Sequence, residues 1–102
     1  MYSASVSNPT ASPQKPVRFD DIPLSSEARA GLKALGYELA TPVQAAVFGV
    51  AMAGRDLVVQ SKTGTGKTTA FGLPLIERIR REQELTDPQA LVLCPTRELA
   101  IQ

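Results

Sequence analysis

The stretch that decides the fold is residues 57–68, Leu57-Val58-Val59-Gln60-Ser61-Lys62-Thr63-Gly64-Thr65-Gly66-Lys67-Thr68. An apolar run typical of a strand leads into a glycine-rich turn, and a helical pattern follows. Gly64 and Gly66 lack a Cβ, so the backbone there can curl and approach a phosphate closely. Strand, turn and helix in this order predict a phosphate-binding loop over residues 61–68.

The chemistry of this loop follows from its residue types. Its backbone amides, with the helix N-terminus behind them, form a nest for an anion. Lys67 reaches the terminal phosphates as a point charge, and the hydroxyl of Thr68 is placed to coordinate Mg²⁺. The general pattern has Gly where this chain has Ser61. The alternative reading is a turn rich in Gly and Thr before a helix, with a solvated lysine.

The composition of the chain limits the function classes. Its 102 residues are enough for one small domain, and 43% apolar and 21% charged residues are ordinary for a soluble globular chain. The net charge of +1 neither favours nor excludes a nucleic-acid partner. The absence of histidine excludes His-based catalysis and His metal sites.

The single cysteine and the hydropathy pattern bear on the compartment. Cys94 has no partner for an intramolecular disulfide, which suits a reducing, cytoplasmic compartment. No apolar run reaches the roughly 18 residues of a membrane helix, and the N-terminus lacks the regions of a signal peptide. We therefore expect a cytoplasmic protein with no membrane partner.

The N-terminal part of the chain combines a polar tail with a first helix. Residues 1–18 are rich in Ser, Pro, Asn and Ala, which predicts a disordered tail and a fold that begins at Phe19. Ser25 or Ser26 can cap a helix that runs to about Leu35. One face of this helix is expected to be apolar and comprises Leu24, Ala28, Leu32 and Leu35.

The second helix has a strong local start signal. Thr41 is a good N-cap, Pro42 suits the first helical position, and Gln44 completes a capping box. The helix is expected to run to about Met52 and to stop at Gly54. Its expected buried positions are Val43, Ala46, Val47 and Val50.

The third helix and a second strand complete the expected elements. The helix should cover residues 66–84, with a kink at Pro74 and a solvated charged face over residues 77–84. Its apolar positions include Phe71, Pro74, Leu75 and Ile79. Residues 90–94 are a continuous apolar run typical of a strand covered on both faces, with Cys94 as a buried core thiol. The expected class is α/β, with a parallel sheet flanked by helices.

Three motifs together resemble the DEAD-box family of ATP-dependent RNA helicases, over residues 19–102. Residues 36–44 resemble its glutamine motif, with Phe19 as the isolated upstream aromatic, and residues 61–68 resemble its ATP-binding loop. Its RNA-contacting segment is matched at residues 95–102 by Pro95-Thr96-Arg97-Glu98-Leu99-Ala100 and Gln102. The family usually has Ala where Ser61 stands and Pro where Ala40 stands. The resemblance implies the first half of an N-terminal RecA-like P-loop NTPase domain.

The resemblance also implies roles for individual residues. Gln44 would hydrogen-bond the adenine edge, Tyr37 would stack on its face, and Phe19 would support Tyr37 by packing. The alternatives are a Gln44 that only caps its helix and a Tyr37 that is an ordinary, partly buried aromatic. The complete set implied to bind ATP is Phe19, Tyr37, Gln44, Ser61, Lys62, Thr63, Gly64, Thr65, Gly66, Lys67, Thr68 and Thr69. Lys67 and Thr68 carry the catalytic roles, and Thr68 is the Mg²⁺ ligand.

RNA contacts and catalysis depend on further segments. Pro95, Thr96 and Arg97 would contact RNA phosphates, and the alternative is a helix cap with a surface arginine. The family's Asp-Glu-Ala-Asp segment does not occur in these 102 residues, nor does a second domain with an arginine finger. We expect this incomplete chain to need the remainder of the helicase core for turnover. The alternatives are a nucleotide-binding, RNA-binding or regulatory module without activity, and another P-loop enzyme such as a GTPase or kinase.

Overall fold

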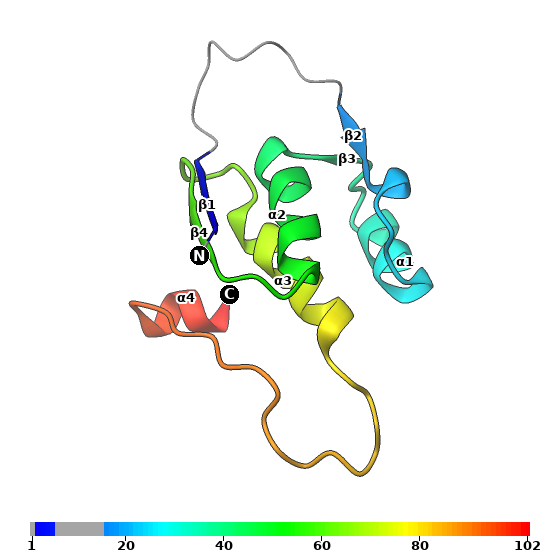
Figure 1. The fold of residues 1–102 in the computed structure, drawn as a ribbon, viewed down its shortest axis with the longest axis vertical. Coiled ribbons are helices and arrows are strands. Elements are labelled where there is room, and N and C mark those ends of the chain that lie inside the picture. The colour runs from blue at the N-terminus through cyan, green and yellow to red at the C-terminus, as the bar shows by residue number, and fades with distance from the viewer. Residues whose placement is uncertain (1, 6–15) are drawn as a thin grey trace.

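The computed structural model describes residues 2–5 and 16–102 (Figure 1). The elements, in chain order, are β1 (Tyr2–Ser5), β2 (Val17–Arg18), a 3₁₀ turn (Phe19–Asp21), α1 (Ser26–Ala34), β3 (Leu39–Ala40), α2 (Pro42–Met52), β4 (Leu57–Gln60), α3 (Lys67–Arg78) and α4 (Arg97–Ile101). The described chain contains both helices and short strands, so it is a small α/β structure.

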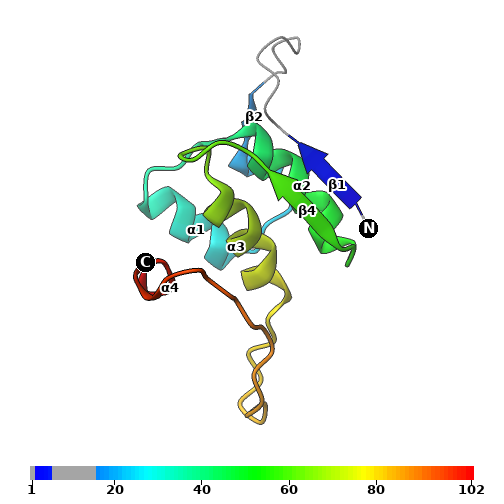
Figure 2. The same cartoon turned by 90° about the vertical axis from the view of Figure 1, so that its left-hand side faces the viewer.

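Two helices stand between a strand pair and α1. In Figure 1 the pair β1–β4 lies on the left, α2 and α3 lie in the middle, and α1 lies on the right. Strand β1 runs parallel to β4, with Tyr2 opposite Leu57 and Ser5 opposite Gln60. Strands β2 and β3 form a separate antiparallel pair. Figure 2 shows the same order from the side, with β1 and β4 toward the viewer.

Two apolar clusters hold these layers together. The first joins the lead-in to α1 with α1, α2 and α3, and consists of Phe19, Ile22, Leu24, Leu32, Phe48 and Leu73. The second lies between α2, α3 and β4, and consists of Val43, Val47 and Ala70 with Ala51, Leu57 and Val59 against it. Helices α2 and α3 therefore bury residues toward both neighbours, which fixes β4 and the loop after it relative to α1.

The predicted helix starts are confirmed. Ser25 caps α1 by accepting a hydrogen bond from the amide of Ala28 at 3.2 Å. In α2, Thr41 and Gln44 form the predicted capping box, and Gly54 follows the helix with a φ of +79°. These signals depend only on residues within one turn of the helix end, so they could be recognised in the sequence.

Helix α3 ends at Arg78, so the prediction that it extends to residue 84 is wrong. Two side chains of its last turn bind the ends of other helices. The carboxylate of Glu77 accepts hydrogen bonds from Ser25 N at 3.0 Å and Ser25 Oγ at 2.6 Å. Arg78 Nη1 donates to the carbonyl of Ala51 at 3.2 Å, at the C-terminal end of α2. The charges of Glu77 and Arg78 thus match the dipoles of the helix ends that they meet.

The segment after α3 lacks the predicted strand. Residues 90–94 are irregular, Leu91 and Leu93 are exposed to 83% and 85%, and the predicted buried thiol of Cys94 is exposed. A strand needs a neighbour that satisfies its N–H and C=O groups, and none of the described strands pairs with this run. The apolar composition of residues 90–94 did not show whether a neighbouring strand was present to pair with them.

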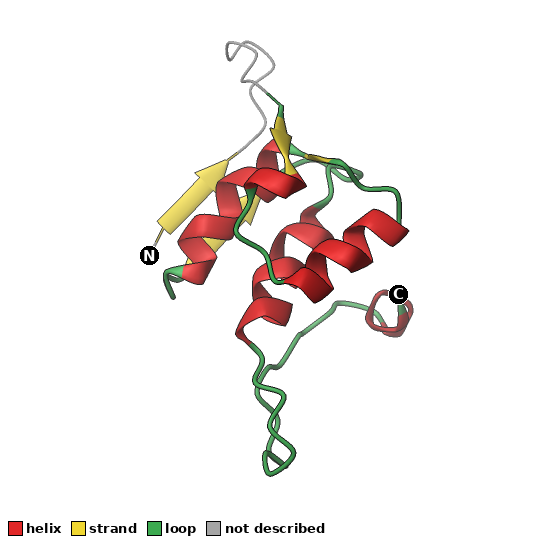
Figure 3. Ribbon diagram, turned by 90° about the vertical axis from the view of Figure 1, so that its right-hand side faces the viewer, coloured by secondary structure: helices red, strands yellow, loops and turns green. Residues whose placement is uncertain are grey.

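Between α3 and this run, residues 81–88 form a loop that one side chain closes at its base. Gln89 Oε1 accepts from Arg80 N at 2.8 Å, and Gln89 Nε2 donates to Arg80 O at 2.7 Å. The side-chain amide of Gln89 therefore satisfies both backbone groups of Arg80, as a paired strand would. Figure 3 shows the resulting narrow loop, which projects from the helices before the chain reaches α4.

Two strands fall within the predicted tail. Residues 2–5 form β1 and residues 17–18 form β2, so for these residues the prediction of disorder is wrong, while residues 6–15 lie outside the described part. The physical reason is pairing, because the backbone of β1 meets an edge of β4 and that of β2 meets β3. Strand pairing uses backbone N–H and C=O groups, so it does not depend on large apolar side chains.

The predicted apolar faces are correct only in part. On α1, Leu24 and Leu32 are buried, but Leu35 lies beyond the helix and is exposed to 70%. The residues Ala46, Phe71 and Ile79 are exposed, while Gln44, Phe48 and Leu73 are buried. Because α2 and α3 each contribute side chains to two apolar clusters on different sides, one apolar stripe did not describe which residues they bury.

Candidate nucleotide-binding site

The predicted phosphate loop connects β4 to α3. Gly64 and Gly66 have φ values of +83° and +88°, the left-handed region that favours glycine. Gly66 is the N-cap of α3 and offers no side-chain cap, so the amides of the first turn are not bound by a capping side chain. Left-handed glycines followed by such amides are the geometry of an anion nest.

Side chains tie the two ends of the loop together. Lys67 Nζ donates to the carbonyl of Ser61 at 2.5 Å. Thr65 Oγ1 donates to the carbonyl of Lys62 at 2.6 Å, and it also hydrogen-bonds Ser61 Oγ. The start of the loop is thereby bound both to its end, through Lys67, and to its middle, through Thr65.

Gln44 joins the glutamine segment to the phosphate loop. Its side chain is only 7% exposed. Oε1 accepts from the amide of Thr41 at 2.9 Å, and Nε2 donates to the carbonyl of Gly66 at 3.3 Å. A Cβ on Gly66 would lie 2.4 Å from Nε2, so any other residue there would force the end of the Gln44 side chain to move. The structure thus brings Gln44 and Gly66 together across 22 residues of sequence.

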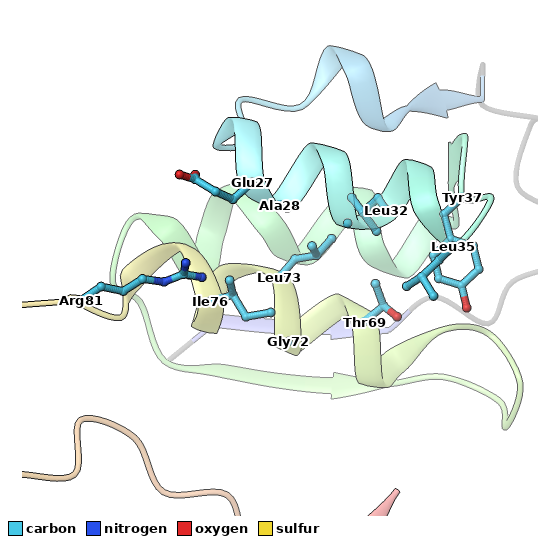
Figure 4. A pocket seen from close by; sticks show the side chains of 11 residues that line it. Glu27, Ala28, Leu32, Leu35, Tyr37, Thr69, Gly72, Leu73, Ile76 and Arg81 are labelled. Atoms are coloured by element: carbon cyan, nitrogen blue, oxygen red, sulfur yellow. The ribbon is translucent and has the colours of Figure 1, made fainter.

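A groove between α1 and α3 begins beside the loop (Figure 4). It encloses about 370 Å³. Tyr37, 49% exposed, and Thr69, two residues after Lys67, both line it. Figure 4 shows Tyr37, Leu35 and Thr69 at one end and Glu27, Ile76 and Arg81 at the other. The end next to the phosphate loop therefore offers an aromatic ring and a hydroxyl.

Phe19 does not line this groove. Its side chain is 3% exposed and belongs to the apolar cluster under α1, and its amide donates to the carbonyl of Glu38 at 3.0 Å. With Tyr37 it lines a second hollow, on the other side of α1. Phe19 thus supports the segment that carries Tyr37.

The remaining loop residues face solvent. Lys62, Thr63, Gly64 and Thr68 are exposed, and Thr68 lies in the first turn of α3 directly after Lys67. Among the described residues, no group of three or more His, Cys, Asp or Glu side chains could hold a metal ion. An accessible hydroxyl suits a cation that takes its other ligands from phosphate and water, which is how Mg²⁺ is commonly held.

The predicted RNA-contacting residues lie apart from the loop. Pro95, Thr96 and Arg97 are exposed, and Thr96 caps α4 by accepting from Leu99 N at 3.3 Å. In Figure 1, α4 lies below the start of β4, whereas the phosphate loop follows the other end of that strand. The structure therefore does not bring the two predicted sites together.

Comparisons with known proteins agree with these motifs. Residues 41–102 match the family model of the DEAD/DEAH box helicase. The chain belongs to the DEAD/DEAH box helicase family. The DEAD-box ATP-dependent RNA helicase CshA of Bacillus licheniformis is 48% identical over 86 residues, which cover 84% of this chain and 17% of that protein. The ATP-dependent RNA helicase DDX50 of Homo sapiens is 46% identical over 93 residues, 87% of this chain and 13% of that protein.

The match extends through the N-terminal segment in another relative. The ATP-dependent RNA helicase DRS1 of Lodderomyces elongisporus is 41% identical over 101 residues, 99% of this chain and 15% of that protein. The chain thus spans about a sixth of the length of the curated relatives that it matches. Among the described residues, no helix combines the length and the apolar character needed to cross a membrane.

Sequence reasoning missed three contacts of this helicase segment. The capping box predicted the bond from Thr41 to Gln44, but nothing in the sequence indicated that Gln44 also reaches Gly66. Glu77 was expected on a solvated face, yet it binds Ser25 and so holds α1 against α3 along the groove. The pair Ser61–Thr65 had no sequence signal beyond two hydroxyls in one loop.

Proposed function

We propose that this chain carries part of the ATP site of an ATP-dependent RNA helicase, as the first half of an N-terminal RecA-like domain with a parallel sheet flanked by helices. The observation that carries the proposal is the hydrogen bond from Gln44 to Gly66, because it places the side chain that we propose to read the purine against the phosphate loop. The names of the matched relatives agree with this function.

The phosphates of ATP would lie on the amides of the loop. Gly64 and Gly66 allow the backbone to face the phosphates, and Lys67 would move its ammonium from the carbonyl of Ser61 toward the terminal phosphates. Thr68 would provide the protein's hydroxyl ligand to a Mg²⁺ that also binds phosphate oxygens. That ion would neutralise charge on the phosphates.

The base would lie at the end of the groove formed by Tyr37 and Thr69. Tyr37 is exposed enough to stack on a purine. Gln44 uses one of its two Nε2 hydrogens for Gly66 and one acceptor position of Oε1 for Thr41. One donor and one acceptor remain, the pair that the adenine edge requires. Capping and adenine recognition are therefore compatible in Gln44.

RNA binding and hydrolysis belong to the proposal for the whole protein. Pro95, Thr96 and Arg97 would contact RNA phosphates, where the guanidinium of Arg97 provides the charge. Turnover would require the acidic segment and the arginine finger of a complete helicase core, so we propose no turnover for these 102 residues alone. A cytoplasmic location is part of the same proposal.

The test compares nucleotide binding and turnover in the full-length protein that carries this chain. We expect MgATP to bind in preference to MgGTP, and Lys67→Ala to remove RNA-stimulated ATPase activity. Lys33→Ala is the matched control, because Lys33 is exposed near the end of α1 and outside the groove. Unchanged ATPase activity in Lys67→Ala would show that the role of Lys67 is wrong. Equal displacement by GTP would favour another P-loop enzyme.

A further inference from the structure

The loop contains a hydroxyl pair that the proposed function has not used. Ser61 and Thr65 stand at the start and in the middle of the phosphate loop, and their side-chain oxygens are hydrogen-bonded. Ser61 is half-buried, and it occupies the position where the general phosphate-loop pattern has glycine. A glycine there has no side chain and could not form this contact.

The protons of the pair can be assigned from distances. Each hydroxyl has one hydrogen. Both hydroxyls can donate to the carbonyl of Lys62, Thr65 Oγ1 at 2.6 Å and Ser61 Oγ at 3.5 Å. The shorter contact assigns that carbonyl to Thr65, so Ser61 Oγ donates the hydrogen that it shares with Thr65 Oγ1. The result is a chain of hydrogen bonds from Ser61 through Thr65 to the backbone of Lys62.

This chain spans the curved part of the loop. Gly64 and Gly66, on either side of Thr65, have the positive φ values of the nest, and α3 begins directly afterwards. Lys67 Nζ binds the carbonyl of Ser61, the residue whose hydroxyl binds Thr65. Ser61 is thus held by its backbone and by its side chain, so contacts within the protein itself support the curvature of the loop.

We infer that Ser61 is a positioning residue for the nucleotide phosphates, which acts through Thr65 to keep the loop curved before the nucleotide arrives. The inference rests on the proposed function and deepens it. A loop that is already curved loses less conformational freedom when it binds a ligand, so affinity rises without a new contact to that ligand. This gain in affinity should apply to ligands that carry phosphates, because Tyr37 and Gln44, which are proposed to bind the base, are not part of the Ser61–Thr65 pair.

The experiment measures three ligands with the full-length protein that carries this chain. MgATP, inorganic tripolyphosphate and adenosine are titrated against the unmodified protein, Ser61→Ala, Thr65→Val and the double variant. We expect each single variant to weaken MgATP and tripolyphosphate by about two- to tenfold, the range of one net hydrogen bond. Adenosine affinity should not change. The double variant should be no weaker than the weaker-binding single variant, because both remove the same link.

Two further variants separate positioning from a general loss of structure. Ser61→Thr keeps the hydroxyl and should restore most of the phosphate affinity, while Thr86→Val removes an exposed hydroxyl from the distant loop and should have no effect. Melting curves check that each variant is folded. If Ser61→Ala bound MgATP as well as the unmodified protein, or weakened adenosine equally, Ser61 would have no positioning role.

The outcomes distinguish this inference from the proposed function. If the unmodified protein binds MgATP and the variants in the hydroxyl pair are unaffected, only the role of Ser61 is wrong. If the unmodified protein binds neither MgATP nor tripolyphosphate, the proposed function and the role of Ser61 are wrong together.

Discussion

Nε2 of Gln44 donates to the carbonyl of Gly66 at 3.3 Å, and the space between the two residues leaves no room for a Cβ on Gly66. The same carbonyl accepts the amide of Ala70 at 3.0 Å, in the first turn of α3. Gly66 therefore joins α2 to the start of α3 at the point where the phosphate loop ends. A change at either residue should affect both the fold and the proposed nucleotide site.

Gly66→Ala should destabilise the protein and weaken MgATP binding. The left-handed conformation, with a φ of +88°, would cost about 1–2 kcal/mol for a residue with a Cβ, and Gln44 would have to move away. Urea denaturation and MgATP titration measure the two effects. Gly49→Ala is the matched control, since Gly49 lies within α2 with nothing within 4 Å of a new Cβ. The free energy of unfolding of Gly49→Ala should rise by about 0.4–1 kcal/mol. Equal stability of the two variants would contradict the geometry at Gly66.

Gln44→Glu should separate the two roles of Gln44. The carboxylate keeps an acceptor for the amide of Thr41, but it has no hydrogen for the carbonyl of Gly66 or for a purine acceptor. We expect α2 to remain capped, and the preference for ATP over GTP to be lost. Competition between the two nucleotides measures the preference, and Gln89→Glu is the control for the same exchange in the projecting loop. A preserved preference in Gln44→Glu would restrict Gln44 to capping.

The tie between Ser25 and Glu77 should contribute to the stability of α1. Glu77→Ala would remove two acceptors from Ser25, one for its amide and one for its hydroxyl. Because Glu77 is half-exposed, we expect a loss of about 1 kcal/mol in the free energy of unfolding, below the roughly 1.5–3 kcal/mol typical of a hydrogen bond to a charged group. Urea denaturation of Glu77→Ala, Ser25→Ala and the double variant gives the coupling between them. Strictly additive losses would mean that the two residues stabilise the fold independently.

Features that depend on neighbouring residues were predicted well. The capping box of Thr41 and Gln44, the cap at Ser25 and the glycines of the phosphate loop all involve contacts within one or two turns. In each case the residue types and their spacing contain the whole interaction. The family could be recognised for the same reason, because its motifs are local.

Features that depend on distant partners were not predicted. Residues 90–94 have the composition of a covered strand but no paired neighbour among the described strands. Tyr2–Ser5 have no continuous apolar run, yet they form a strand because they pair with β4. Glu77 was expected in solvent because its partner Ser25 lies 52 residues away. Strand pairing and helix contacts of this kind depend on residues that are distant in sequence, so local propensity predicts them poorly.

The exposed run after α3 leads to a last prediction about the strand that did not form. Leu93 is 85% exposed, so Leu93→Lys should change the free energy of unfolding of this chain by less than about 0.5 kcal/mol. Val43 is 1% exposed between α2, α3 and β4, and Val43→Ala should cost about 1.5–3 kcal/mol. Denaturation of both variants in the 102-residue chain measures the contrast. A loss in Leu93→Lys as large as that in Val43→Ala would mean that residues 90–94 are covered in solution, as the sequence first predicted.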